Sequence, residues 1–144
     1  MRAGHEETRA EEIRARMATS PFHTWMGMRV LEVRSGEVDL ELEAADHHVN
    51  LQGQVHGGVL ATLADTAAGL AVRSMLPAGA RHVTVNLDVQ YVRAAGTGRL
   101  VAHGRCTRAG RSIAFATADV TDPDGGLLAR AQATVAVSPP PADG

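Results

Sequence analysis

The stretch NLQGQVHGGVLATLADTAAGLA, residues 50–71, predicts the central element of the fold. After its first residues it consists almost entirely of Val, Leu, Ala and Gly, which is typical of a helix that is buried on most of its surface. The helix is expected to run from about His56 to Leu76, where the sequence PAGA ends it. Asp65 interrupts the apolar surface, although burying an unpaired carboxylate is costly. We therefore hypothesise that Asp65 has a functional role.

The segments on either side of this helix alternate apolar and polar residues, as half-buried strands do. Before the helix, residues 29–34 and 37–44 are expected to form a hairpin. After it, four consecutive antiparallel strands are expected within residues 82–92, 96–108, 111–120 and 127–137. In the first of these four strands the alternation predicts one apolar face and one polar face. The apolar face would hold Val83, Val85, Leu87, Val89 and Tyr91, and the polar face Thr84, Asn86, Asp88 and Gln90.

These elements predict an α+β fold in which one curved antiparallel sheet wraps around a long central helix. A charged helix from Glu6 to Met17 precedes it, and Pro21 and Gly27 in the sequence SPFHTWMGM are expected to end that helix. We therefore predict a charged N-terminal extension in residues 1–19, one domain in residues 20–138, and a disordered tail in residues 139–144.

Composition places the chain among single-domain globular proteins. It has 144 residues, of which 44% are apolar and 21% charged, and Cys106 is its one cysteine, so an intrachain disulfide is excluded. The net charge of -2 argues against a nucleic-acid-binding surface. The N-terminal residues lack the apolar segment of a secretory signal. The glycines and Asp65 of the central helix argue against a membrane-spanning helix. These features predict a cytoplasmic protein that binds neither nucleic acid nor membrane.

One run of residues carries a specific resemblance to a known family. The run is Asn50-x2-Gly53-x2-His56-Gly57-Gly58-x4-Leu63-x-Asp65. It resembles the hotdog-fold acyl-CoA thioesterases of the PaaI type, the phenylacetate-pathway branch, and the similarity covers roughly residues 20–138. The resemblance implies the hotdog fold, hydrolysis of an acyl-CoA, and a homodimer with shared active sites that pairs again into a homotetramer.

Thioester hydrolysis needs a group that activates water or attacks the carbonyl, and a donor that holds the oxyanion. Asp65 is the candidate base or nucleophile. Gly57 and Gly58 begin the helix, where backbone N–H groups have no intrahelical partner, so we expect the Gly57 N–H to be the oxyanion donor and Gly58 to lie against the substrate. The alternatives are a structural, hydrogen-bonded Asp65 and glycines that serve only close packing.

Three further residues are catalytic candidates. The amide of Asn50 would orient the water or the thioester carbonyl, a role that the resemblance also implies. His56 would either donate to the substrate or fix the loop before the helix. Thr84 matches a family position that orients water, or is an ordinary strand residue.

The basic residues are unevenly distributed along the chain. All 14 are Arg, and residues 81–111 hold six of them with Asp88 as the only acid. Arg93, Arg108 and Arg111 are the candidates for contacts with CoA phosphates, and the alternative is a solvated strand face. We expect no metal, because the histidines beside Asp46 lack ligands at metal spacing, and no cofactor, because coenzyme A is part of the substrate.

We therefore predict a thioester hydrolase that converts an acyl-CoA, with phenylacetyl and other aryl groups as candidates, to a carboxylic acid and CoA. An enoyl-CoA hydratase or dehydratase with the same fold is the first alternative, and a non-catalytic module that binds CoA ligands is the second. Gly57 and Asp65 are eight residues apart, or roughly 12 Å along a helix, which is too far for both to serve one carbonyl carbon. The shared site of an antiparallel helix pair in a dimer would bring them together.

Overall fold

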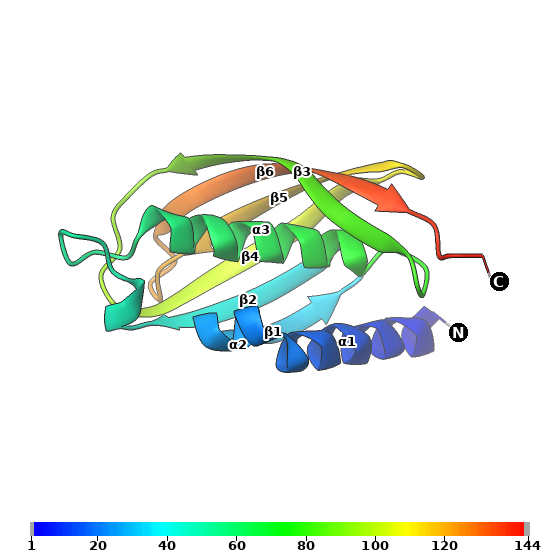
Figure 1. Cartoon of the computed structure of the whole chain (residues 1–144), viewed down its shortest axis with the longest axis horizontal. Helices are drawn as coiled ribbons and strands as arrows, with labels where there is room; N and C mark the ends of the chain where they lie inside the picture. Colours follow the sequence, from blue (N-terminus) through cyan, green and yellow to red (C-terminus); the bar gives the residue numbers. More distant parts are fainter. Residues whose placement is uncertain (1, 143–144) are drawn as a thin grey trace.

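The computed structural model describes residues 2–142 of the chain. Two helices precede a hairpin, a long helix and four more strands, in the order that the colours of Figure 1 follow. The elements are α1 (Arg2–Thr19), α2 (Pro21–Met26), β1 (Met28–Arg34), β2 (Glu37–Ala44), a 3₁₀ turn (Asp46–His48), α3 (Gly57–Arg73), β3 (Arg81–Tyr91), β4 (Gly98–Ala109), β5 (Ile113–Thr121) and β6 (Leu127–Ser138).

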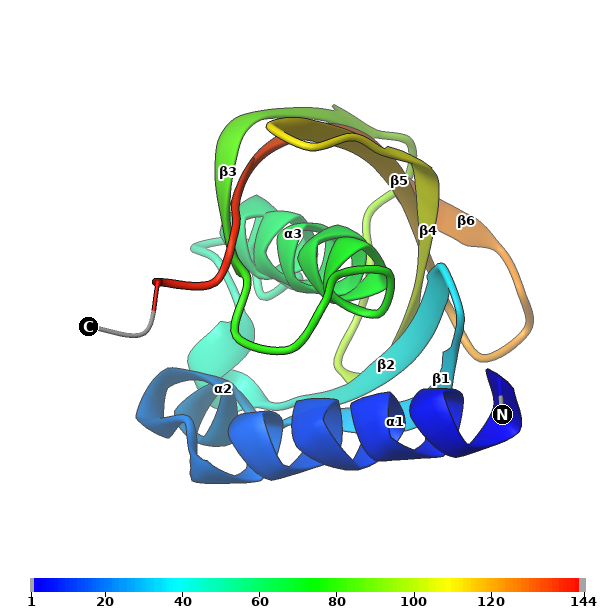
Figure 2. The same ribbon diagram turned by 90° about the vertical axis from the view of Figure 1, so that its right-hand side faces the viewer.

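The strands form one antiparallel sheet in the order β1-β2-β4-β5-β6-β3. Figure 2 shows this sheet curving around α3, so the predicted α+β architecture is confirmed. The last four strands are antiparallel, as expected, but they do not pair in simple succession. β3 pairs with β6, and β4 pairs with β2, which is the second strand of the hairpin that precedes α3. The helix between β2 and β3 makes this order possible, because it carries the chain from one side of the sheet to the opposite edge.

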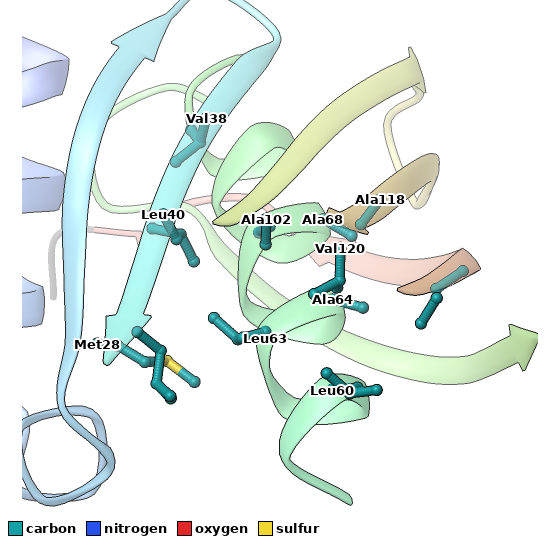
Figure 3. Close-up of a cluster of buried hydrophobic side chains, with 14 of the residues drawn as sticks. Met28, Val38, Leu40, Leu60, Leu63, Ala64, Ala68, Ala102, Ala118 and Val120 are labelled. Atoms are coloured by element: carbon teal, nitrogen blue, oxygen red, sulfur yellow. The ribbon is translucent and has the colours of Figure 1, made fainter. Parts of the chain in front are cut away.

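The core lies between the concave face of the sheet and α3 (Figure 3). Val38, Leu40 and Leu42 of β2 are 0% exposed, which confirms the alternation predicted for this strand. Leu63 and Ala64 of α3 are also fully buried, and Figure 3 shows Leu63 on the side of β2 and Ala64 beside Val120 of β5. Apolar burial on this scale is the main favourable contribution to folding, and it fixes the orientation of α3 about its axis.

Close contact between α3 and β4 depends on Gly104. A Cβ atom added at this position would overlap the backbone carbonyl of Ala67 and approach the Ala68 nitrogen to 2.9 Å. Both Ala67 and Ala68 are 0% exposed, and α3 makes more of its contacts with β4 than with any other strand. The missing side chain therefore sets the distance at which the central helix packs on the sheet.

The predicted faces of β3 are wrong for its first half. A β-bulge at Val85 interrupts the pairing with β6, since Thr84 lies opposite Val135 and Asn86 opposite Thr134. One extra residue reverses the alternation of side chains. His82 and Thr84 consequently share the inner side with Leu87 and Val89. Two residues predicted to be buried, Val83 and Val85, are instead 64% and 61% exposed.

The helices differ from the prediction mainly at their ends. α3 ends at Arg73 and not near Leu76, because the next three residues form a turn. α1 is longer than the expected 6–17, and the sequence after it forms the unexpected short helix α2, which Ser20 caps and Gly27 ends in the left-handed conformation at φ 82°. Residues 139–142 form no helix or strand, and residues 143–144 of the predicted tail lie outside the described residues.

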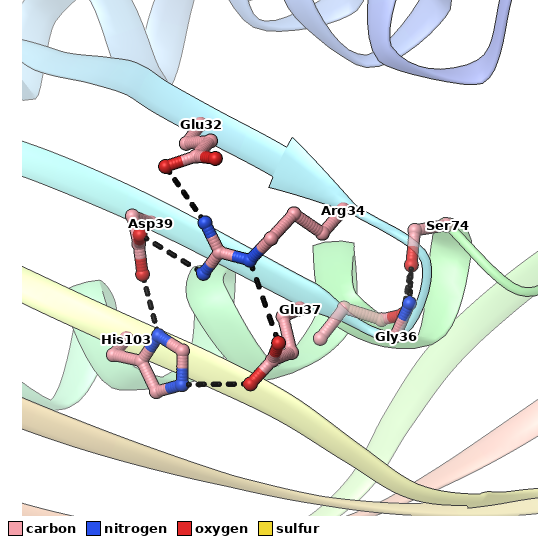
Figure 4. A network of polar contacts seen from close by, with 8 residues as sticks. Glu32, Arg34, Gly36, Glu37, Asp39, Ser74 and His103 are labelled. Carbon is pink, nitrogen blue, oxygen red and sulfur yellow. Dashed lines mark hydrogen bonds and ion pairs between the residues drawn. The ribbon is translucent and has the colours of Figure 1, made fainter. Parts of the chain in front are cut away.

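The convex face of the sheet carries charged side chains where β1, β2 and β4 meet (Figure 4). Arg34 contacts Glu32 at 2.7 Å, Asp39 at 3.1 Å and Glu37 at 3.4 Å, and His103 bridges Asp39 and Glu37. The Glu32 and Asp39 carboxylates raise the pKa of the Arg34 guanidinium. None of the candidate site residues belongs to this network. Within residues 2–142, every helix is too short or too polar to cross a membrane.

Candidate active site

A cleft of about 440 Å³ opens beside α3 and contains the carboxylate of Asp65. α3 forms one wall and β3 another, and α1 and α2 close the remaining side. Asp65 is half-buried, as expected of a charged group that lies at the edge of a core but still reaches solvent. The polar and charged residues that line the cleft are Arg16, Thr19, Ser20, His23, Asp65, Thr66, Arg73, His82 and Thr84.

Thr84 fixes the orientation of the Asp65 carboxylate. Its hydroxyl donates a hydrogen bond to Oδ1 of Asp65 at 2.7 Å. Oδ2 accepts no hydrogen bond from any other side chain or backbone group of residues 2–142. One carboxylate oxygen is therefore held and the other is left for a water molecule or a substrate. The structure thus brings two of the predicted catalytic residues, Asp65 and Thr84, into direct contact.

Two histidines that the sequence analysis did not single out also line this cleft. Burial lowers the pKa of His23, and the nearby Asp65 opposes that shift. Burial also lowers the pKa of His82, as do the charges of Arg73 and Arg16. Both rings are therefore neutral at pH 7. His82 could have been found from its position two residues before Thr84 on the same strand, whereas no sequence signal points to His23.

The first turn of α3 lies at the other end of the helix and offers one free backbone donor. The Nδ1 atom of His56 accepts the N–H of Gly58 at 2.8 Å and caps the helix. A Cβ atom at Gly58 would lie 2.9 Å from His56 Nδ1, so a side chain there would displace the imidazole that caps the helix. Among the described residues, no group accepts the N–H of Gly57. Gly57 thus retains the donor that the sequence analysis assigned to it, and the Gly58 donor is already used.

Tyr91 at the end of β3 supports Gly57, a role that the sequence analysis missed. Its hydroxyl donates to the Gly57 carbonyl at 3.0 Å. A Cβ atom at Gly57 would lie 3.2 Å from the Tyr91 ring. The ring therefore packs on the glycine backbone and holds the first turn of the helix in place. The alternating pattern of β3 suggested only that Tyr91 was one of several apolar residues.

Asn50 organises the loop that leads into α3. Its side-chain oxygen accepts the N–H groups of Gln52 at 3.0 Å and Gln54 at 3.1 Å. The side-chain NH₂ group makes no hydrogen bond to a described residue, so it remains a donor. Asn50 thus has a structural role through its oxygen, and the predicted contact with a substrate or water would use its nitrogen.

A single chain does not bring the two groups of candidates together. Gly57 and Asp65 are eight residues apart in α3, so about 12 Å of helix separates them. The residues that line the Asp65 cleft do not include Asn50, His56 or Gly57. Within one chain the candidate residues therefore lie in two separate places, one with the carboxylate and one with the free N–H.

The three candidate arginines for CoA phosphates are also separated. Arg93 pairs with Asp122, and its backbone lies beside Leu128 at the start of β6. Arg108 pairs with Phe115 of β5, which in turn pairs with Thr134 of β6. Thr134 is six residues after Leu128, so about 20 Å of strand separates Arg108 from Arg93. Arg111 follows in the turn beyond β4. One end of the sheet thus holds Arg93, and the other holds Arg108 and Arg111.

One curved antiparallel sheet wrapped around a long central helix is the hotdog fold. The family model described as Thioesterase superfamily matches residues 52–129, and the chain belongs to this family. The match covers α3 with Gly57 and Asp65, and β3 with Thr84. The chain is therefore a thioester hydrolase.

Several known proteins are similar to this chain over most of its length. A Halobacterium salinarum protein described as a candidate esterase is 39% identical over 105 residues, 69% of each chain. Human acyl-coenzyme A thioesterase 13 is 28% identical over 120 residues, which are 82% of this chain and 85% of the human protein. A solved structure from Ralstonia eutropha, described as a phenylacetic acid degradation-related protein, has a TM-score of 0.78 at 30% identity, with 86% of this chain and 98% of that chain covered.

Proposed function

We propose that this protein hydrolyses acyl-CoA thioesters to a carboxylic acid and free CoA. The observation that carries the proposal is the Asp65 carboxylate in an open cleft, with one oxygen held by Thr84 and the other free. The name of the human relative, an acyl-coenzyme A thioesterase, supports CoA as the thiol component.

Asp65 would act on the thioester carbonyl in one of two ways. As a general base, its free oxygen takes a proton from a water molecule, and the water oxygen attacks the carbonyl carbon. As a nucleophile, the same oxygen attacks directly, and water then cleaves the resulting anhydride. In both cases the C–S bond breaks and CoA leaves as a thiolate. The Gly57 N–H would hold the oxyanion, because it is a free donor at the positive end of a helix dipole.

Asn50 and His56 would complete the site around the oxyanion. The NH₂ group of Asn50 is free to donate to the carbonyl or to the attacking water. Because Nδ1 of His56 accepts from Gly58, the neutral ring carries its proton on Nε2, which could donate to the substrate. Gly58 would shape the approach to this site through its missing side chain. The reaction needs no metal and no cofactor besides the CoA of its substrate.

We also propose that the protein is a homodimer with two shared active sites. Two α3 helices packed antiparallel would place the Gly57 end of each chain beside the Asp65 of the other. β3 supports this arrangement, because it is an edge strand of the sheet and exposes Val83 and Val85. Pairing of two such dimers into a homotetramer rests on the resemblance alone, and a cytoplasmic location stays the prediction made from the sequence.

A mixed dimer tests whether two chains share each site. Asn50→Ala and Asp65→Asn chains are each expected to be inactive as homodimers. Co-expressed in equal amounts, half of the dimers are mixed, and each mixed dimer has one intact site, so roughly a quarter of wild-type activity should return. The measurement is thiol release by the unselected dimers. Mixed dimers purified through a different tag on each chain should show roughly half of wild-type activity, because one of their two sites is intact. Inactive mixed dimers would show that each site belongs to one chain.

The arginines would hold the phosphates of CoA in two separate places. Arg108 and Arg111 make no ion pair with residues 2–142, so both guanidinium groups are available to a phosphate. Arg93 already pairs with Asp122 and would have to exchange partners. We therefore expect Arg108 and Arg111 to contribute more than Arg93 to CoA affinity.

An aryl acyl group, such as phenylacetyl, is the proposed substrate type within this class. The resemblance to the PaaI branch supports it, as does the description of the Ralstonia eutropha structure as phenylacetic acid degradation-related. The family match favours hydrolysis over the hydratase and dehydratase alternatives.

A panel of acyl-CoA esters tests the proposed reaction. Purified protein is expected to release free thiol from one or more aryl or aliphatic esters, with kcat/KM of about 10⁴ M⁻¹s⁻¹ or more for the best substrate. An enoyl-CoA in the same panel separates hydrolysis from hydration, because hydration removes the enoyl absorbance without releasing thiol. Loss of absorbance alone would favour the hydratase, and tight binding with no turnover would favour a binding module.

A further inference from the structure

The Asp65 cleft has a positively charged end formed by α1 and the last turn of α3. Arg16 and Arg73 both line the cleft, and both pair with Glu12 of α1. The same carboxylate also pairs with Arg9. One negative charge therefore faces three positive charges, and the positive charge of this cluster is not balanced by its own carboxylate.

The two arginines that line the cleft differ in their freedom to bind a ligand. Arg73 is 1% exposed and is held between the Ala80 carbonyl and Glu12, so it is a fixed charge. Its Nε is buried without a hydrogen-bond partner. Arg16 contacts Glu12 through Nε at 3.3 Å and is 62% exposed. No described residue accepts from its two terminal nitrogens, which are the pair that binds a carboxylate in bidentate fashion.

The effect of this charge extends along the wall of the cleft towards Thr84. After burial, the charges of Arg73 and Arg16 are the next causes that lower the pKa of His82. His82 lies two residues before Thr84 on the same side of β3. A group that entered the cleft past Asp65 would thus meet a neutral imidazole and then a positively charged end.

The length of the cleft matches that of an acyl chain. Asp65 and Arg73 are eight residues apart on α3, or about 12 Å along its axis. An acyl group with its carbonyl carbon at Asp65 could therefore reach the charged end with its last atoms. CoA lies on the other side of the thioester bond, so its phosphates would leave the site in a different direction.

We infer that the Arg16 end of this cleft binds a carboxylate at the far end of the acyl group, which makes dicarboxylyl-CoA esters the preferred substrates. The inference rests on the proposed function, because it takes Asp65 as the position of the thioester carbonyl. A carboxylate that leaves bulk water for this cleft loses part of its hydration, and two hydrogen bonds from the terminal nitrogens of Arg16 offset that loss. The chain between the two carbonyl carbons can be aliphatic or aromatic.

Two esters of equal chain length test this inference. Suberyl-CoA and octanoyl-CoA differ only in a terminal carboxylate against a methyl group. In the wild-type protein kcat/KM for suberyl-CoA should exceed that for octanoyl-CoA, and equal values would overturn the inference. Arg16→Met should lower the ratio of the two values about tenfold, the usual effect of losing a hydrogen bond between charged groups.

Arg14→Met is the matched control, because it removes the same charge from the same helix outside the cleft. Arg14 donates to the carbonyls of Val30 and Leu31, both at 3.0 Å, and the ratio should stay at its wild-type value. An unchanged ratio in Arg16→Met would overturn the inference. So would an equal loss for both esters, which would assign Arg16 to the CoA part of the substrate or to folding.

Thioether analogues of the two esters separate this inference from the proposed function. In these analogues a methylene group replaces the thioester carbonyl, so they bind without being cleaved. If the protein releases thiol from neither of these esters and from no ester of the acyl-CoA panel, the proposed function fails. Tighter binding of the suberyl analogue by calorimetry, lost in Arg16→Met, would still support the carboxylate site, and equal binding of both analogues would overturn it.

Discussion

Asp65→Asn is expected to lower kcat by roughly 10²- to 10⁴-fold, the usual contribution of a positioned acid or base. Asn has nearly the volume of Asp, and its side-chain oxygen can still accept the Thr84 hydroxyl, so the fold should survive. It can neither take a proton from water nor attack a carbonyl. Thiol release under saturating acyl-CoA measures the loss, and KM is expected to change little.

Asp124→Asn is the matched control for this substitution, because it removes the same charge from the exposed turn between β5 and β6. Its kcat should stay near the wild-type value. Thermal unfolding of both variants checks that they are folded. If folded Asp65→Asn protein retained wild-type turnover, Asp65 could be neither base nor nucleophile, and its bond to Thr84 would be purely structural.

Gly104→Ala is expected to destabilise the fold by about 3 kcal/mol or more, at the upper end of the effects of overpacking. The new methyl group would overlap the backbone of Ala67, and no side-chain rotation can relieve a clash between a Cβ atom and a backbone carbonyl. α3 would have to move away from β4, which would open the core along the helix. The free energy of unfolding from urea denaturation measures the effect.

Gly96→Ala is the control for Gly104→Ala. A Cβ atom at Gly96 meets nothing within 4 Å, so this variant should unfold within about 0.5 kcal/mol of the wild type. Poor soluble expression of Gly104→Ala beside normal expression of Gly96→Ala would agree with the expected loss. Wild-type stability of Gly104→Ala would mean that the contact between α3 and β4 is looser than described.

The sequence predicted those helices and strands in which the spacing of apolar residues stays constant along the whole element. β2 is the clearest case, because Val38, Leu40 and Leu42 alternate with acidic residues and are all fully buried. The run of small and apolar residues in α3 likewise predicted a helix surrounded by a sheet. In both elements the burial of apolar surface determines the structure, and that is the property a hydrophobic pattern reports.

Features that depend on contacts between residues far apart in the sequence could not be predicted from the spacing of apolar residues. Nothing in the sequence from His82 to Tyr91 marks the bulge, since Val83 and Val85 look like buried strand residues although they are exposed. The pairing of β3 with β6 is set by the path of the chain around α3 and not by the composition of either strand. The α2 helix has only six residues, too few for a periodic signal.

The sequence predicted which residues are candidates for the site, but not how they are arranged in space. The Gly57–Gly58 pair and Asp65 stand out in the sequence, and helix geometry already indicated that one chain could not join them. The contact between Thr84 and Asp65 arises only because the bulge turns Thr84 inward. Arg16 and Arg73 are far apart in sequence and meet at Glu12, so only the folded chain reveals a charged end to the cleft.

The bulge at Val85 gives β3 two independent tasks within 11 residues. Side chains before it, at His82 and Thr84, line the Asp65 cleft, and side chains after it, at Leu87 and Val89, pack against the core. If the proposed function holds, substitutions before Val85 are expected to change turnover, and substitutions after it to change stability. Relatives could differ at the residues before the bulge while the residues after it keep the core packed. Substrate specificity could therefore change in evolution through this strand without loss of the fold.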